Sequence, residues 1–247
     1  MLRLDKTGYM FIIFLSMFFM LGTLQVDATP EQDEGSIEKS KVTDEPEAEQ
    51  KLRTADVTTQ SEDQPVKIFL DPGHGGDDAG AQSNGIKEKD VVLDIALKTK
   101  EVLDNEYEGV ETKLSRSSDK FIELEDRAQQ ANDWGADYFT SFHLNSFDGS
   151  ASGFESYIYN GNVSEETKTR QHHVHTYLAD RLEVDDRGKQ SANYSVLRNT
   201  SMSSILLEYM FIDDSDENEL LQKEDYRDQL GELTAESIAD TYDLNKK

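Results

Sequence analysis

From Val66 onward, short apolar segments alternate with longer amphipathic ones, and this alternation limits the possible folds more than any other feature. The short segments are expected to be strands, at 67–70, 110–115, 137–143, 153–160, 194–198 and 204–209. The longer segments carry apolar residues at helical spacing, at 90–103, 123–134, 165–182 and 226–242. Strands joined by crossover helices form a largely parallel sheet that is covered on both faces. We therefore predict a three-layer α/β domain at 66–247, with six strands between two layers of helices.

The first residues of the chain have the pattern of an export signal. Two basic residues precede an apolar run at 10–21, and Val26 and Ala28 occupy the −3 and −1 positions of a cleavage site. The run is short for a membrane span, and an uncleaved N-terminal anchor is the alternative. We predict a signal peptide at 1–28 and a protein that is secreted or held at the cell wall, without stable membrane association after cleavage.

Residues 29–65 differ in composition from the domain that follows them. They hold 11 acidic and 4 basic residues and no aromatic residue. Such a segment cannot bury enough apolar surface to offset the entropy that it would lose on ordering. We predict an acidic, disordered linker at 29–65. The 182 residues that remain are enough for one domain with a single core.

The amino-acid composition excludes several classes of function. The formal net charge is −26, from 51 acidic and 25 basic residues, and the sequence contains no basic patch. A surface of this charge repels phosphate backbones, so we expect no binding to nucleic acid. The chain has no cysteine, which excludes disulfides, thiolate metal sites and a cysteine nucleophile. A metal ion would have to be held by histidines and carboxylates.

Polar residues follow three of the expected strands, at the sheet edge where open α/β folds bind ligands. The first strand runs into Asp71-Pro72-Gly73-His74-Gly75-Gly76, the third ends at His143 and the sixth ends at Glu208. Glu88, in the first turn of the helix after the first strand, is a fourth candidate. Two histidines and one glutamate, with a fourth position open to water, form a known ligand set for catalytic zinc. A further carboxylate beside that water can transfer its proton, so the sequence holds the parts of a metal-assisted amide hydrolase.

Each of these residues also has a purely structural interpretation. Glu88 suits the start of a helix because of the helix dipole, and His143 could be a hydrogen-bonded core histidine. Glu208 is harder to explain in this way. A carboxylate on a buried strand needs a metal, a partner or a raised pKa.

A second group of histidines, His172, His173 and His175, lies in the middle of an expected helix. Successive residues of a helix point in different directions, so at most two of the three could share a ligand. We expect this group to lie on a solvated helix face rather than to form the main site.

Several short motifs occur in an order that resembles one known family. They are Asp71-Pro72-Gly73-His74-Gly75-Gly76, Glu88-Lys89, Leu114-Ser115-Arg116, Ala131-Asn132, Ala136-Asp137, Ser141-Phe142-His143-Leu144-Asn145, Asp186-Arg187-Gly188, Val196-Leu197-Arg198 and Glu208. The order resembles that of the zinc-dependent N-acetylmuramoyl-L-alanine amidases, over essentially all of 66–247. Within that family, the chain is most similar to the cell-wall and sporulation amidases of Gram-positive spore formers.

The resemblance implies a site, a reaction and a fold. His74, Glu88 and His143 correspond to the ligands of Zn²⁺, and Glu208 corresponds to the catalytic glutamate. The family cleaves the amide bond between the lactyl group of N-acetylmuramic acid and the L-alanine of the stem peptide in peptidoglycan. The implied fold is a twisted, mostly parallel six-stranded sheet, in agreement with the strand count above. We expect the chain to act on peptidoglycan as a monomer.

One departure from the family pattern bears on activity. The family usually has Glu-x-Gly-Phe at the catalytic position, whereas this chain has Glu208-Tyr209-Met210-Phe211. A side chain at Met210 could narrow the cleft or displace Glu208. The alternative function is therefore a wall-binding or regulatory module with a weakened site. A zinc carboxypeptidase acting on stem peptides is a third interpretation, which the order of the motifs disfavours.

Overall fold

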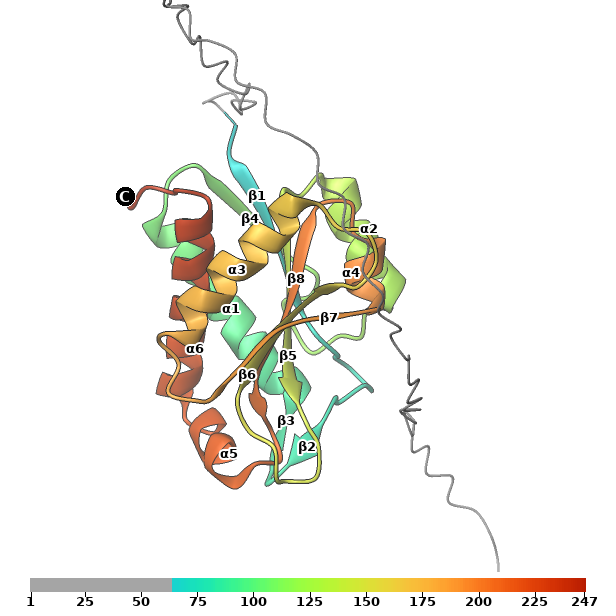
Figure 1. The fold of residues 1–247 in the computed structure, drawn as a ribbon, viewed down its shortest axis with the longest axis vertical. Helices are drawn as coiled ribbons and strands as arrows, with labels where there is room; N and C mark the ends of the chain where they lie inside the picture. Colours follow the sequence, from blue (N-terminus) through green and yellow to red (C-terminus); the bar gives the residue numbers. More distant parts are fainter. Residues whose placement is uncertain (1–63) are drawn as a thin grey trace, which may run out of the picture. The chain divides into compact units, whose positions relative to one another are not determined.

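The computed structural model describes residues 64–247 (Figure 1). The predicted signal peptide at 1–28, and all but the last two residues of the predicted linker at 29–65, lie outside the described residues. Among residues 64–247, no helix is both long enough and apolar enough to cross a membrane.

A six-stranded sheet runs through the centre of the domain (Figure 1). Its strands, in chain order, are β1 (Val66–Pro72), β4 (Val110–Leu114), β5 (Tyr138–Asn145), β6 (Phe154–Tyr159), β7 (Asp186–Ala192) and β8 (Ser203–Phe211). Across the sheet the order is β4-β1-β5-β8-β6-β7, and neighbouring strands are parallel except for β6 and β8, which are antiparallel. The prediction of a mostly parallel six-stranded sheet is confirmed. Two short strands, β2 (Gln82–Ser83) and β3 (Ile86–Lys87), form a separate hairpin.

Helices cover both faces of the sheet and complete the predicted three layers (Figure 1). They are α1 (Glu88–Glu106), α2 (Leu124–Trp134), α3 (Glu165–Ala179), α4 (Ser195–Asn199), α5 (Ser215–Leu221) and α6 (Glu224–Thr241). Helix α6 contacts α1 and α3 on one face, and α2 contacts α4 on the other. Successive side chains of a strand point to opposite faces of the sheet, so the apolar residues of β1 contact the helices of both layers. Ile68 and Leu70 are buried in the core with α1 and α6, and Phe69 is buried in the core with α2 and α4.

The structure corrects one element of the predicted sheet. Residues 194–198, predicted as a strand, instead form the N-cap and most of the short helix α4. Val196 and Leu197 are both buried against the α2 side, whereas a strand would point such neighbours to opposite faces. The sixth strand is β7, at the edge of the sheet. Its sequence has no apolar alternation because most of its side chains are exposed.

The order of the strands places a topological switch point between β1 and β5. The chain leaves β1 for β4 on one side, and it leaves β5 for β6 on the other. Open α/β sheets bind ligands at the carboxyl ends of the strands that flank such a point. His74 follows β1 and His143 lies near the end of β5, so the two predicted histidines flank this position.

Candidate metal centre

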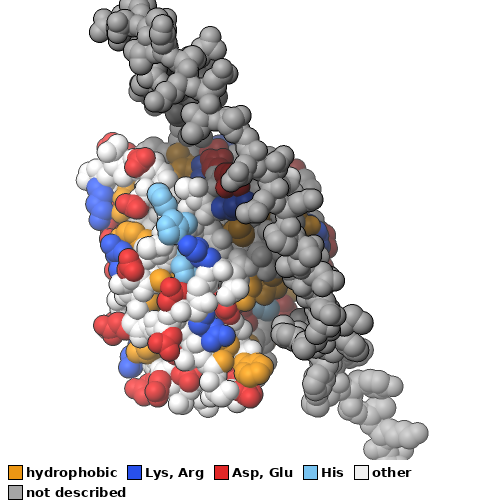
Figure 2. All heavy atoms as spheres, viewed as in Figure 1, with side chains coloured by type: hydrophobic (Ala, Val, Ile, Leu, Met, Phe, Trp, Pro, Cys, Tyr) orange, Lys and Arg blue, Asp and Glu red, His pale blue; other side chains and the backbone are white. Residues whose placement is uncertain are grey.

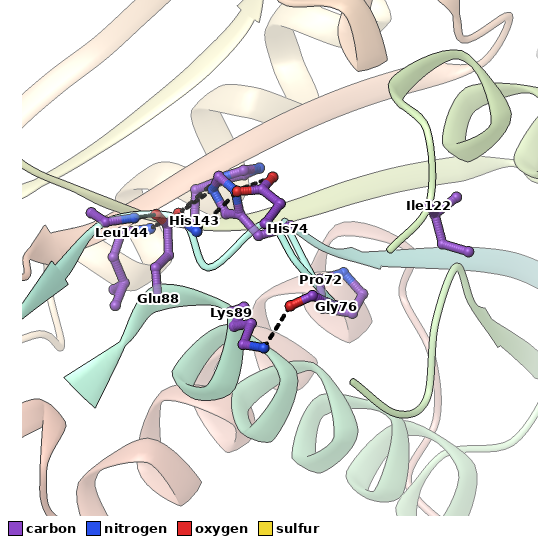
Figure 3. Close-up of polar contacts among 12 residues, drawn as sticks. Pro72, His74, Gly76, Glu88, Lys89, Ile122, His143 and Leu144 are labelled. Carbon is purple, nitrogen blue, oxygen red and sulfur yellow. Dashed lines mark hydrogen bonds and ion pairs between the residues drawn. The ribbon is translucent and has the colours of Figure 1, made fainter. Parts of the chain in front are cut away.

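Three of the predicted site residues converge at the carboxyl edge of the sheet (Figure 3). The Oε1 atom of Glu88 lies 3.0 Å from Nε2 of His74 and 2.9 Å from Nδ1 of His143. One possible ligand atom from each residue lies within 4.8 Å of the other two. The two imidazole rings meet edge to face, with centroids 5.0 Å apart. Two imidazole nitrogens and one carboxylate oxygen are a donor set that fits a zinc ion.

Glu88 is the most buried member of this group, with 4% of its side chain exposed. It is the first residue of α1, where the helix dipole favours a carboxylate. Backbone N–H groups bind both of its oxygens: Leu144 donates to Oε1 at 3.0 Å, and Ala81 donates to Oε2 at 2.8 Å. Burial raises the pKa of Glu88, but hydrogen bonds from His143 and His74 outweigh burial and hold that pKa well below its usual value. The carboxylate is therefore ionised and held in one orientation.

His74 lies in the turn after β1, with a φ of +59° that is rare for a residue other than glycine. Arg127 of α2 donates a hydrogen bond to its backbone oxygen at 2.6 Å and stabilises this turn. The Nδ1 atom of His74 lies 2.8 Å from Asp78 Oδ2. A carboxylate in this position favours the proton on Nδ1 and leaves Nε2 available to a metal. Asp78 and Arg127 thus support His74, and neither was among the residues predicted from the sequence.

His143 approaches the turn after β1 very closely. A Cβ atom at Gly73 would lie 2.3 Å from the His143 ring. Any side chain at Gly73 would therefore displace the imidazole or the turn. The glycine that precedes His74 in the sequence motif is required so that the second imidazole can reach the site.

Glu208 lies beside His143, because these two residues are paired in the parallel register of β5 and β8. It lines a cavity of about 160 Å³ together with His74 and His143. Its Oε2 atom is buried and has no hydrogen-bond partner within residues 64–247. Burial raises the pKa of Glu208 well above its usual value, and the charges of Glu88 and Glu155 raise it further. A buried carboxylate oxygen without a partner, next to a possible metal site, indicates a group that receives a ligand or a proton.

Met210 does not narrow this cavity. Its side chain is fully buried in the larger core, and Met210 is not among the residues that line the cavity. The register of β5 and β8 is irregular between His143 and Asn145, directly after the pairing of His143 with Glu208. Such an irregularity changes the direction of the side chains that follow it. Met210 therefore gives no support to the idea of a weakened site.

The second group of histidines is divided between the surface and the core. His172 and His173 are exposed, and histidine side chains are visible at the surface over α3 in Figure 2. His175 is buried, with Nδ1 2.9 Å from Ser156 Oγ and Nε2 2.9 Å from Asp186 Oδ1. The prediction of a solvated face is thus right for the first two histidines and wrong for His175, because α3 turns this residue toward β6 and β7.

A buried ion pair fixes the turn after β1. Asp71 and Arg127 are almost fully buried, and Oδ1 of Asp71 lies 2.8 Å from Nη1 of Arg127. Ser115 donates its hydroxyl hydrogen to Oδ1 of Asp71 at 2.6 Å, and Ser141 donates to Oδ2 at 2.9 Å. Arg116 adds two hydrogen bonds to backbone oxygens of the same turn. The turn that carries the first histidine is therefore held at once from β5, from α2 and from the two residues that follow β4.

Comparisons with known proteins identify the family of the chain. The family described as N-acetylmuramoyl-L-alanine amidase matches residues 68–240. A sporulation-specific N-acetylmuramoyl-L-alanine amidase of Bacillus subtilis is 44% identical over 181 residues, which cover 73% of this chain and 70% of that protein. The endolysin of Bacillus phage SPP1 is 46% identical over 184 residues, which cover 73% of this chain and 67% of the endolysin.

A solved structure shows the same fold. The crystal structure of an N-acetylmuramoyl-L-alanine amidase from Clostridium difficile 630 matches with a TM-score of 0.70 and 33% sequence identity. The match covers 73% of this chain and 98% of that one. The family match covers residues 68–240, and the two relatives and the solved structure each match 73% of the chain. The chain belongs to the N-acetylmuramoyl-L-alanine amidase family.

Proposed function

We propose that this chain is a zinc-dependent peptidoglycan hydrolase. It cleaves the amide bond between the lactyl group of N-acetylmuramic acid and the L-alanine of the stem peptide. One observation carries the proposal: two imidazole nitrogens and a carboxylate oxygen converge beside the buried, unpartnered oxygen of Glu208. The names of the relatives support the choice of substrate.

An enzyme with this substrate has to reach the cell wall, and the N-terminal sequence offers a route. We propose that 1–28 are an export signal that is removed on secretion. Residues 29–65 then form an acidic linker ahead of the catalytic domain at 66–247, and the enzyme acts on the wall as a monomer.

His74, Glu88 and His143 are the residues that would hold the zinc ion. His74 contributes Nε2, because its Nδ1 atom is engaged by Asp78. Glu88 contributes Oε1 and His143 contributes Nδ1. Three protein donors leave one coordination position for water or substrate. When bound, zinc lowers the pKa of a water molecule and polarises a carbonyl oxygen.

Glu208 is the residue that we assign to proton transfer. Its carboxylate accepts a proton from the attacking water, at an oxygen that has no other partner in the described domain, and returns it to the nitrogen of the leaving L-alanine. Glu88 and Glu208 suit different roles, because the pKa of Glu88 is lowered and the pKa of Glu208 is raised. Glu88 stays ionised, as a ligand must, whereas Glu208 is able to hold a proton between the two steps.

Digestion of purified cell walls tests the proposed function. The zinc-loaded chain should release free amino termini of L-alanine, and mass spectrometry should find stem peptides separated from intact N-acetylmuramic acid. Cleavage within the stem peptide would identify a carboxypeptidase instead. Sedimentation with walls without release of any peptide would favour a binding module.

Removing zinc should abolish activity and lower the melting temperature. The three donors come from β5, from α1 and from the turn after β1, so an ion that binds them links distant parts of the chain. A ligand that binds only the folded state stabilises it by about 2.7 kcal/mol when its free concentration is 100 times its Kd. The measurement is Tm and activity before chelation, after chelation and after zinc is restored. Full activity and an unchanged Tm after complete chelation would contradict the assignment.

Replacing Asp78 with Ala should weaken zinc binding about 10- to 100-fold, because the carboxylate no longer orients the His74 ring or selects its tautomer. Competition with a chromophoric chelator measures the Kd. The matched control is Asp77→Ala, which removes the exposed carboxylate next in sequence. A similar loss in both variants would show that only the overall charge near the site matters.

A further inference from the structure

Exposed apolar side chains gather around the candidate metal centre. Among the described residues, the large exposed hydrophobic side chains include Phe121 (43% exposed), Leu124 (54%) and Tyr194 (38%). All three line the cavity that also contains His74 and Glu208. An apolar surface left in water beside a reactive site indicates that a ligand covers it.

Phe121 is exposed although its backbone is firmly held. The segment before α2 packs on the turn after β1, where a Cβ atom at Gly76 would lie 2.9 Å from the Phe121 backbone nitrogen. Gly76 donates its N–H group to Asp119 at 2.7 Å. Lys89 donates to the Gly76 oxygen at 2.8 Å (Figure 3) and to Asp119 at 2.7 Å. The exposure of the ring is therefore a property of a well-supported surface beside the site.

The cavity has two apolar walls. Phe121 and Leu124 form the wall beside the turn that carries the first histidine. Tyr194 forms the other wall, and its ring lies 5.3 Å from the ring of Tyr157, centroid to centroid. Tyr157 belongs to β6, which pairs with β8 around Glu208. The proton-transferring carboxylate therefore lies on the Tyr194 side of the cavity.

The proposed reaction orients the substrate between these walls. Glu208 returns a proton to the leaving nitrogen, so L-alanine and the rest of the stem peptide lie on its side, toward Tyr194. The acyl group lies on the opposite side of the bond that is cleaved. The lactyl group and the sugar ring attached to it therefore extend toward Phe121.

We propose that Phe121, flanked by Leu124, is a platform for the pyranose ring of N-acetylmuramic acid; this inference rests on the proposed function. The face of an aromatic ring carries negative potential and attracts the polarised C–H bonds on the flat face of a sugar. The contact also covers the apolar surface of both Phe121 and Leu124. Phe121 thereby selects muramoyl peptides over other N-acylated peptides.

Two substrates separate recognition of the sugar from cleavage of the amide. The first is N-acetylmuramoyl-L-alanyl-D-isoglutamine. The second is the same dipeptide acylated with O-methyl-lactic acid, which keeps the amide bond and lacks the sugar. The wild-type chain should have the higher kcat/KM for the first substrate. Phe121→Ala should reduce this preference by about three- to tenfold, because kcat/KM should fall much more for the muramoyl substrate than for the sugar-free one.

Phe147→Ala is the matched control, because Phe147 is 71% exposed and does not line the cavity. It should leave kcat/KM unchanged for both substrates, and Phe121→Trp should retain the preference for the sugar. Equal losses on both substrates in Phe121→Ala would show that the side chain only supports the turn, and would overturn the platform. Unchanged kcat/KM values for both substrates in Phe121→Ala would overturn it as well.

Failure of the platform and failure of the proposed function give different results. A wild-type chain that cleaves both substrates equally well keeps the function and overturns the platform. Calorimetry with the muramoyl compound covers the other case. A wild-type chain that cleaves neither substrate, but binds this compound more tightly than Phe121→Ala does, keeps the platform and overturns the function.

Discussion

Replacing Glu208 with Gln should lower kcat by about 10²- to 10⁴-fold while the chain keeps its zinc. Gln has the size of Glu but its amide accepts no proton from water at neutral pH. No other group forms a hydrogen bond with the buried Oε2 atom within the described domain, so no neighbour is placed to take over the transfer. Zinc should remain, because Glu88 rather than Glu208 contacts both histidines. The measurements are kcat on the muramoyl dipeptide and zinc content by atomic absorption.

Glu155→Gln is the control for the loss of a carboxylate at this position. Glu155 is paired with Glu208 in the antiparallel register of β6 and β8, and it is also buried. Its carboxylate already has partners, since Asn145 donates to it and Arg187 lies 3.7 Å away. We therefore expect a much smaller change in kcat. If Glu208→Gln kept most of the wild-type kcat, or lost its zinc, the role assigned to Glu208 would be wrong.

The convergence of the candidate ligands was predictable because each has a local signal in the sequence. His74 follows one predicted strand and His143 ends another, and the carboxyl ends of parallel strands meet at one edge of a sheet. Glu88 opens the helix that returns from the same edge. His74 and His143 are 69 residues apart in the sequence, but the strand order brings their possible ligand atoms within 4.8 Å of each other.

Residues that act through their neighbours have no such signal. Asp78 lies four residues after His74 in a glycine-rich turn, but its contact depends on a His74 backbone angle that the sequence does not specify. Arg127 lies on an amphipathic helix and resembles a solvated basic residue. Its burial follows from Asp71, which lies near the buried end of β1 and needs a positive charge within reach. Contacts of this kind require the tertiary structure.

Secondary structure at the far edge of the sheet was unpredictable for a different reason. The strand β7 pairs only with β6, and an edge strand with exposed side chains needs no apolar pattern. The helix α4 is too short for helical periodicity, which takes more than one turn to appear. The predicted number of strands was right although one member was misplaced, because 194–198 was counted in place of β7.

Replacing Asp71 with Ala should lower the free energy of unfolding by about 3–5 kcal/mol. The substitution leaves the guanidinium group of Arg127 buried without its counter-charge, and this desolvated charge is the main cost. The hydroxyl groups of Ser115 and Ser141 also lose their acceptor. Urea unfolding at a fixed zinc concentration measures the change, since bound zinc contributes to stability by itself.

The pair Lys100 and Asp104 provides the control at the surface. Its N–O distance is 2.6 Å, similar to that of the buried pair, but both side chains are partly exposed. Asp104→Ala should therefore cost about 0–1 kcal/mol. The double variant Asp71→Ala, Arg127→Met removes both buried charges and should be more stable than Asp71→Ala alone. The single variant Arg127→Met completes the comparison. If the loss of stability in the double variant equalled the sum of the losses in Asp71→Ala and Arg127→Met, the two side chains would act independently and the buried pair would not hold the turn as described.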